Sequence, residues 1–251
     1  MNDLALKELL YKMADDLLII GHRHSEWTGF GPLLEEDIAF SSMAQDKIGQ
    51  SYVLYQLLNQ LGEQAPDTIA FTRPAHEFKN SIFTELPNGE YDFSLIRHFL
   101  FDTAYAIRFD LLAVSAYTPL AELATKIKGE LRYHTLHAST FIKQLGNATP
   151  ESISRLDSAL SVALPYAVGV FEQSPFEYEL VKNNIFAGEE LVQQRWKEQV
   201  EAVLSQTNLS IPQWAGIQPV YGGRAGNHSE YLQPLITEMS EVFRIDPLAE
   251  W

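Results

Sequence analysis

Apolar side chains recur every three or four positions along most of the chain, and almost no segment alternates with period two. This spacing is typical of amphipathic helices with one buried face. Prolines and glycines mark the breaks between the helical segments. The pattern predicts six long helices, over residues 3–27, 34–61, 93–116, 120–145, 151–172 and 188–206, with one more helix in the C-terminal segment. We expect a kink at Pro165 and a C-cap at Gly146.

The connection between the second and third helices is unusual for its length. A connection of about 30 residues with little secondary structure is uncommon, and such connections are often functional. It contains three prolines and concentrates Arg73, His76 and Lys79 in an otherwise acidic chain. Cations suit a ligand that carries phosphates, but a cap on the end of a helical bundle is an equally good interpretation.

The order of the predicted helices indicates a fold class. Two long helices, a long connection and two further long helices form the order of a ferritin-like four-helix bundle. We therefore predict an all-α, ferritin-like four-helix bundle with extra C-terminal helices, and we expect residues 1–251 to form a single domain.

The composition of the chain argues against several classes of partner and several kinds of chemical site. The 251 residues include 33 acidic and 18 basic ones, a formal net charge of −15, which argues against nucleic acid or an anionic membrane as a partner. The absence of cysteine excludes disulfides, thiolate metal sites and cysteine nucleophiles. The N-terminus lacks the apolar core of a signal peptide, and no apolar run approaches the roughly 20 residues of a transmembrane helix. We expect a soluble, cytoplasmic protein.

Each of the four long helices carries one carboxylate on its expected apolar face: Asp16, Asp46, Asp102 and Glu130. Asp16 and Asp46 are 30 residues apart, and Asp102 and Glu130 are 28 apart. These separations are expected for facing positions on antiparallel helices joined by short turns. Four carboxylates at one level of a bundle are half of the ligand set of a di-metal centre.

The other half of that ligand set is missing. Di-metal carboxylate bundles use Glu-x-x-His, but Gly49 stands three residues after Asp46 and Tyr133 three after Glu130, with His134 one place late. Two interpretations remain. The carboxylates are protonated or paired internally, because unpaired buried charges are costly, with candidate partners Lys12, Arg23, Lys47 and the histidines. Alternatively, a di-metal site uses shifted ligands among His98, His134 and His137.

Two further motifs receive structural interpretations. His22 and His24 are two residues apart, on different sides of a helix, so we interpret them as surface or interface residues. The glycine-rich segment 222–226, GGRAG, is preceded by no strand, and we interpret it as a packed loop rather than a dinucleotide fingerprint.

Four segments together carry a family resemblance: DTIAFTRPAHEFKN (67–80), PNGEYDFSLIRHFLFDTAYAIRFDLL (87–112), KGELRYHTLH (128–137) and the C-terminal GGRAGNHSEYLQPLITEMSEVFRIDPLAEW. Over nearly its whole length the chain resembles the non-catalytic C subunit of bacterial phenylacetyl-CoA epoxidase, a ring 1,2-phenylacetyl-CoA monooxygenase. The resemblance implies a metal-free structural subunit in aerobic phenylacetate catabolism. It also implies a homologous catalytic subunit, with the di-iron centre, as the partner.

The resemblance further implies a complex that uses dioxygen to epoxidise the ring of phenylacetyl-CoA. In it a reductase supplies electrons from NADPH, and small accessory subunits are further partners. It implies no catalytic residue and no cofactor in this chain. Residues near the CoA part of the substrate would be Glu77, Phe78, Lys79, Asn80, Tyr178, Glu179 and Leu180.

Two competing functions stay open. One is a di-metal carboxylate oxygenase or oxidase that is active in its own right, and the other is a simple acyl-CoA binding module. If the chain is a subunit, we expect the early helices to hold its partner, because Leu9–Tyr11 and Val53–Tyr55 are consecutive apolar residues.

Overall fold

The computed structural model describes residues 3–247 and 249, and every regular element among them is a helix. The prediction of an all-α chain with the helix order of a ferritin-like bundle and extra helices is confirmed. The chain divides into two compact units. We call Met1–Ala5 with Asn88–Tyr221 the central unit, and Leu6–Pro87 with Gly222–Trp251 the terminal unit. That residues 1–251 form a single domain stays a prediction.

The helices of each unit have the following bounds. The terminal unit contains α1 (Asp3–Ser25, whose first residues belong to the central unit), α2 (Leu34–Gln60), α3 (Pro66–Thr72), η1 (Ala75–Glu77), α4 (Ile82–Glu85), η3 (Gly223–Ala225) and α10 (Leu232–Ile245). The central unit contains α5 (Tyr91–Leu112), α6 (Thr118–Leu145), α7 (Pro150–Gly169), α8 (Glu177–Lys182), α9 (Glu189–Leu204) and η2 (Trp214–Gly216).

The long helices agree with the predicted ranges to within a few residues, and Gly146 is the C-cap of α6. Helix α7 continues through Pro165 to Gly169, and the Pro165 carbonyl oxygen accepts a hydrogen bond from Val220. The connection before α5 differs from its prediction, because it contains α3, η1 and α4. Pro66 stands at the start of α3, where a missing backbone N–H costs nothing.

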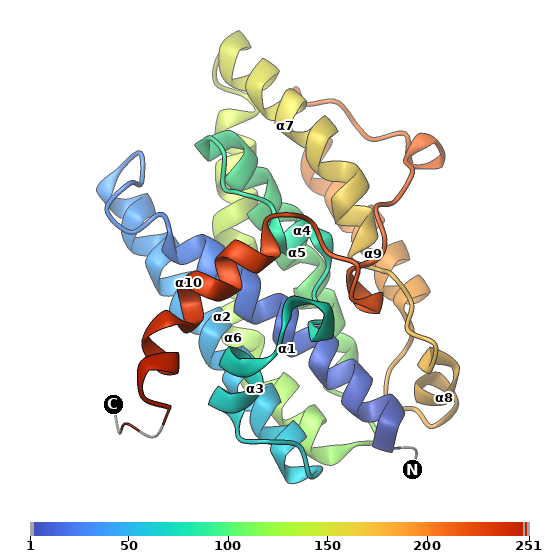
Figure 1. Cartoon of the computed structure of the whole chain (residues 1–251). Helices are drawn as coiled ribbons and strands as arrows, with labels where there is room; N and C mark the ends of the chain where they lie inside the picture. The colour runs from blue at the N-terminus through green and yellow to red at the C-terminus, as the bar shows by residue number, and fades with distance from the viewer. Residues whose placement is uncertain (1–2, 248, 250–251) are drawn as a thin grey trace. The chain divides into compact units, whose positions relative to one another are not determined.

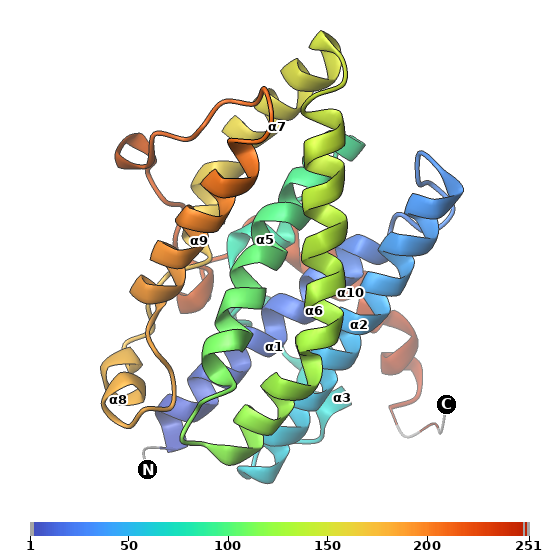
Figure 2. The same ribbon diagram turned by 180° about the vertical axis from the view of Figure 1, so that it is seen from behind.

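Helix α5 is the core of the central unit. Nearly every residue from Ser94 to Phe109 is buried, and α6, α7 and α9 all pack against this helix. Figure 2 shows α5 flanked by α6 and α9. Trp196 of α9 is fully buried and its indole N–H donates to the Leu100 carbonyl oxygen at 2.9 Å. A helix in such a central position is buried on all sides, so the polar side chains that it carries, among them His98 and Asp102, are buried as well.

In the terminal unit, α1 and α2 are neighbours that approach closely. The Ser51 hydroxyl of α2 donates to the Ala14 carbonyl oxygen of α1 at 2.8 Å. A Cβ atom on Gly21 of α1 would lie 2.9 Å from an Ile48 side-chain carbon, so the glycine permits this approach. Figure 1 shows this helix pair with α3 and α10 beside it.

The GGRAG segment lies against the backbone of residues 76–80, as expected for a packed loop. A Cβ atom on Gly223 would overlap the carbonyl oxygen of Asn80, and one on Gly226 would overlap that of His76. Gly226 also has a φ of 81°, in the left-handed region that favours glycine. The two backbones can therefore approach each other this closely only because Gly223 and Gly226 have no side chain.

This close approach makes Gly223 a sensitive position. We expect Gly223→Ala to lower the free energy of unfolding by about 1–3 kcal/mol, the usual cost of forced overpacking. Gly49→Ala is the matched control, because a Cβ there meets nothing within 4 Å. In the interior of α2 the control should be neutral or stabilising by up to about 1 kcal/mol. Urea unfolding of both variants checks this, and equal midpoints would contradict it.

Candidate functional site

The four carboxylates predicted at one level fall in both units. Asp16 and Asp46 belong to the terminal unit, and Asp102 and Glu130 belong to the central unit. Asp16 and Asp102 are fully buried, Asp46 is half-buried and Glu130 is exposed. Asp16 and Asp102 are therefore the two whose charges need partners inside the protein.

Asp16 is held by an arginine and a backbone N–H group. Its carboxylate accepts from the Ser81 backbone N–H at 2.6 Å and from the Arg224 guanidinium at 2.7 Å. Arg224 is itself buried and also donates to the carbonyl oxygens of Lys79 and Lys12, at 2.7 and 3.3 Å. A buried carboxylate with these donors is a structural ion pair, with its charge already compensated.

The preceding residue, Asp15, makes a second buried pair. It accepts from the Arg73 guanidinium at 2.5 Å, the Tyr55 hydroxyl at 2.5 Å and the Lys79 backbone N–H at 2.7 Å. Burial opposes the charge of Arg73, but Asp15 more than offsets this, so the pKa of Arg73 is raised above its ordinary value. Burial, reinforced by the Asp15 carboxylate, raises the pKa of the Tyr55 phenol. Arg73 also lies over the Phe78 ring, 4.2 Å from its centroid.

Arg73 was a candidate for ligand phosphates, and its position favours the alternative, a cap. Its guanidinium also lies over the rings of Tyr11 and Tyr55, at 5.0 and 5.8 Å. Together with Asp15 these rings surround the cation, so the connection is fastened onto α1 by its own arginine.

In the central unit, Asp102 has histidine partners. His98 donates from Nδ1 to one carboxylate oxygen at 2.6 Å, and His134 donates from Nδ1 to the other at 3.3 Å. The Nε2 atom of His98 lies 3.2 Å from Nδ1 of the half-buried His137. The expectation that histidines would be partners of a buried carboxylate is met at Asp102.

The prediction that Glu130 faces the interior is wrong. The buried face of α6 is formed by Ile127, Leu131, His134 and Ala138. Glu130, one position before Leu131, lies to the side of this face and is exposed. Tyr133, in the place of a metal-binding histidine, is 47% exposed, and Gly49 at the corresponding place of α2 is exposed as well.

These positions do not fit a di-metal centre. Among the residues that the structure describes, no group of three or more histidine, aspartate or glutamate side chains is arranged to hold a metal ion. The Asp16 carboxylate accepts hydrogen bonds from Arg224 and the Ser81 N–H group, and the Asp102 carboxylate accepts them from two histidines. The Glu130 side chain is exposed at the surface.

The residues predicted near a CoA ligand are divided between surface and interior. In the terminal unit, Glu77 is exposed and Lys79 is half-buried, with its Nζ atom 3.7 Å from Glu8. Phe78 and Asn80 are fully buried, and the Asn80 amide donates to Glu85 at 3.0 Å. The positions of Phe78 and Asn80 therefore do not support contact with a ligand.

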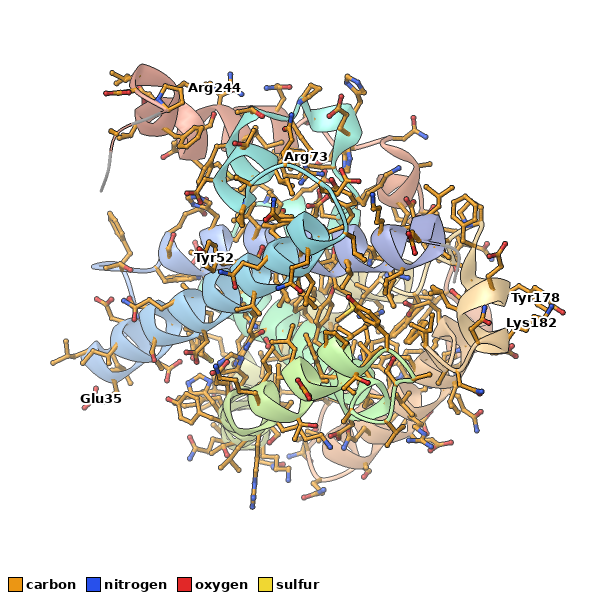
Figure 3. All side chains as sticks on the ribbon, turned by 90° about the horizontal axis from the view of Figure 1, so that it is seen from below. Glu35, Tyr52, Arg73, Tyr178, Lys182 and Arg244 are labelled. Atoms are coloured by element: carbon orange, nitrogen blue, oxygen red, sulfur yellow. The ribbon has the colours of Figure 1, made fainter. Side chains whose placement is uncertain are left out.

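The second predicted segment, in α8 of the central unit, divides in the same way. Tyr178 is 76% exposed, Glu179 is half-buried and Leu180 is buried. Figure 3 shows Tyr178 beside Lys182 on this helix. Of this segment, Tyr178 is the side chain best placed to meet a ligand, and Leu180 is not.

Sequence reasoning also missed a buried cluster around Glu85. One carboxylate oxygen accepts from His228 Nδ1 at 2.5 Å, and the other accepts from the Ser229 backbone N–H and hydroxyl at 2.7 and 2.5 Å. The backbone carbonyl oxygen of Glu85 accepts from Arg23 at 2.7 Å. No sequence spacing reveals these contacts, since more than 140 residues separate Glu85 from His228.

The histidine pair of α1 is only partly at the surface. His24 is fully buried against the edge of Phe40, with ring centroids 5.1 Å apart, so its interpretation as a surface residue is wrong. His22 is half-buried, and burial lowers the pKa of its imidazole.

The fold and the site define a class: an all-α chain with ferritin-like helix order, in which the buried carboxylates at di-metal positions serve structural pairs. The chain belongs to the family described as "Phenylacetic acid catabolic protein", whose model matches residues 1–251. It is 29% identical over 252 residues to the C subunit of 1,2-phenylacetyl-CoA epoxidase from Escherichia coli (strain K12), with 100% of each chain covered. No helix in the described part of the chain is long and apolar enough to cross a membrane.

The pairing of Asp16 with Arg224 can be tested by a double-mutant cycle. Arg224→Met leaves a buried carboxylate uncompensated, so we expect a loss of about 3–5 kcal/mol in the free energy of unfolding. Adding Asp16→Asn removes the charge, and the double variant should recover a large part of that loss. Denaturant unfolding of the two single variants and the double variant gives the coupling energy, and strictly additive effects would contradict the pairing.

Proposed function

We propose that this chain is a structural, metal-free subunit of a multicomponent 1,2-phenylacetyl-CoA epoxidase in aerobic phenylacetate catabolism. The family and the full-length similarity to the C subunit of such an epoxidase support membership of the complex. One observation supports the metal-free role: the buried carboxylates Asp16 and Asp102 are already engaged by Arg224 and by two histidines.

In this proposal the chemistry belongs to a homologous partner. The catalytic subunit holds the di-iron centre, a reductase delivers electrons from NADPH, and small accessory subunits complete the assembly. This chain contributes no catalytic residue and supports the fold and position of the catalytic subunit.

A di-metal oxygenase or oxidase active in its own right is the main competing function. It would require Arg224 to leave Asp16. Because Gly49 and Tyr133 supply no imidazole, it would also require His98 and His134 to give up their hydrogen bonds to Asp102 and act as ligands instead. Breaking buried, hydrogen-bonded charge pairs is expensive. This cost favours the structural role.

Metal content separates the two functions. We expect the purified chain to contain far less than one iron per chain after expression with added iron, and to show no dioxygen-dependent turnover of phenylacetyl-CoA. Co-expressed with the homologous catalytic subunit, it should co-purify in a complex holding about two iron ions per pair, as expected for one di-iron site. Elemental analysis and oxygen-uptake assays measure both. Two metals in the isolated chain, together with turnover, would establish the competing function.

We further propose a modest contribution to the binding of the CoA ester by the half-buried Lys79 and the exposed Tyr178. Lys79 offers an ammonium for a phosphate, and Tyr178 offers an exposed ring and hydroxyl to pantetheine or adenine. An acyl-CoA binding module without partners would need these same contacts to bind phenylacetyl-CoA on their own.

Steady-state kinetics of the reconstituted complex test these contacts. Lys79→Ala and Tyr178→Ala should each raise KM for phenylacetyl-CoA up to about fivefold, because exposed charge pairs are worth only about 0–1 kcal/mol. kcat should stay nearly unchanged, the pattern of lost uniform binding. Lys126→Ala, at an exposed lysine of α6, is the control. Unchanged constants would assign both segments a structural role, and binding by the isolated chain would favour the binding-module alternative.

A further inference from the structure

The terminal unit has an apolar surface that its own core does not use. We call it the α2 outer face, and it consists of Phe30, Leu33, Leu34, Ile38, Ile48 and Tyr52, all exposed. The exposed fractions at its N-terminal end are high: 79% for Phe30, 71% for Leu34 and 60% for Ile38. Figure 3 shows Glu35 at the start of α2 and Tyr52 further along the same helix. Exposed apolar side chains that gather on one side of a helix are typical of interaction sites.

Folding of the unit does not explain these side chains. The opposite side of α2 buries Phe40, Met43, Leu54 and Tyr55, so the helix is apolar on two sides. The consecutive residues expected to provide surplus apolar surface do so only in small part, because Leu9, Leu10, Leu54 and Tyr55 are buried. The surplus lies instead at positions 34, 38 and 52, which share one helical side with Ile48, a residue that also lies against Gly21 of α1.

The charges around this face restrict the partner. Between His24 and Thr72 the sequence has a single lysine or arginine, Lys47, and that side chain is fully buried. Glu35 is exposed beside Leu34 and Asp37 is half-buried beside Ile38, whereas the exposed Glu26 is paired with the Arg23 guanidinium at 2.6 Å. The face is therefore apolar with an acidic edge. A second copy would bring like charges together, which disfavours self-association, while a face with lysine or arginine around an apolar centre is complementary.

We infer that the α2 outer face is the docking surface for the homologous catalytic subunit, and that the facing surface of that subunit is apolar with a basic rim. This inference rests on the proposed function and adds the location and the charge of the interface. Apolar contacts at its centre would determine the dissociation rate, and the acidic edge would mainly raise the association rate.

Substitutions at exposed positions can test the location without disturbing the core. Ile38→Glu and Leu34→Glu should each weaken binding to the purified catalytic subunit about tenfold or more, as expected for a central interface position. Val162→Glu, at a 58% exposed position of α7 in the central unit, is the matched control and should bind like the unchanged chain. Calorimetric titration gives Kd, and circular dichroism melting shows whether each variant is folded. Phe30→Ser, in the loop before α2, gives an independent measurement if a charge within α2 lowers the melting temperature.

Charge reversal tests the chemistry of the partner. Glu35→Lys should slow association and reduce its dependence on salt, because screening weakens the attraction between an acidic edge and a basic rim. If the unchanged chain binds and the three apolar variants bind equally well, the interface lies elsewhere and the proposed function stands. If the unchanged chain does not bind the catalytic subunit, both proposals fail. Faster association of Glu35→Lys would overturn the basic rim.

Discussion

Two adjacent buried carboxylates on α1 determine how the terminal unit is built. Asp15 and Asp16 are fully buried, and a buried charge without partners would cost several kcal/mol. Asp15 therefore holds Arg73 and the Lys79 N–H, and Asp16 holds Arg224 and the Ser81 N–H. Each aspartate accepts one backbone donor from the connection after α2 and one guanidinium. The connection and the C-terminal segment are thus both ordered by a dipeptide in the middle of one helix.

The long helices could be predicted from the sequence, but the structure of the segments that Asp15 and Asp16 bind could not. Apolar periodicity is a local property, so the ends of α2, α5, α6 and α9 could be predicted within a few residues. Helices α3 and α4 were missed because seven and four residues are too short to show a period of 3.6. Helix α3 packs against α2 and α10, and Glu85 of α4 contacts Arg23 of α1, His228 and Ser229, which only the folded chain brings near.

The candidate site shows the same limit at the level of one helix face. Ile127 and His134 belong both to a stripe through Glu130 and to a stripe through Leu131, so spacing alone could not choose between them. The structure buries Leu131, because an aliphatic side chain gains free energy from burial and a carboxylate loses it. The missing histidines at positions 49 and 133 could be read directly from the sequence, whereas the partner of Asp16 could not, since 208 residues separate it from Arg224.

These contacts also support the metal-free role that we propose. In a di-metal bundle the buried carboxylates are reserved for the metals, and the protein must leave their oxygens available to the ions. Here Asp16 accepts hydrogen bonds from an arginine and a backbone N–H group, and Asp102 accepts them from two histidines, so these oxygens already have protein partners. The inferred docking surface agrees with this division. Its exposed apolar side chains lie on the side of α2 opposite the buried one, where they can contact another protein without disturbing these buried pairs.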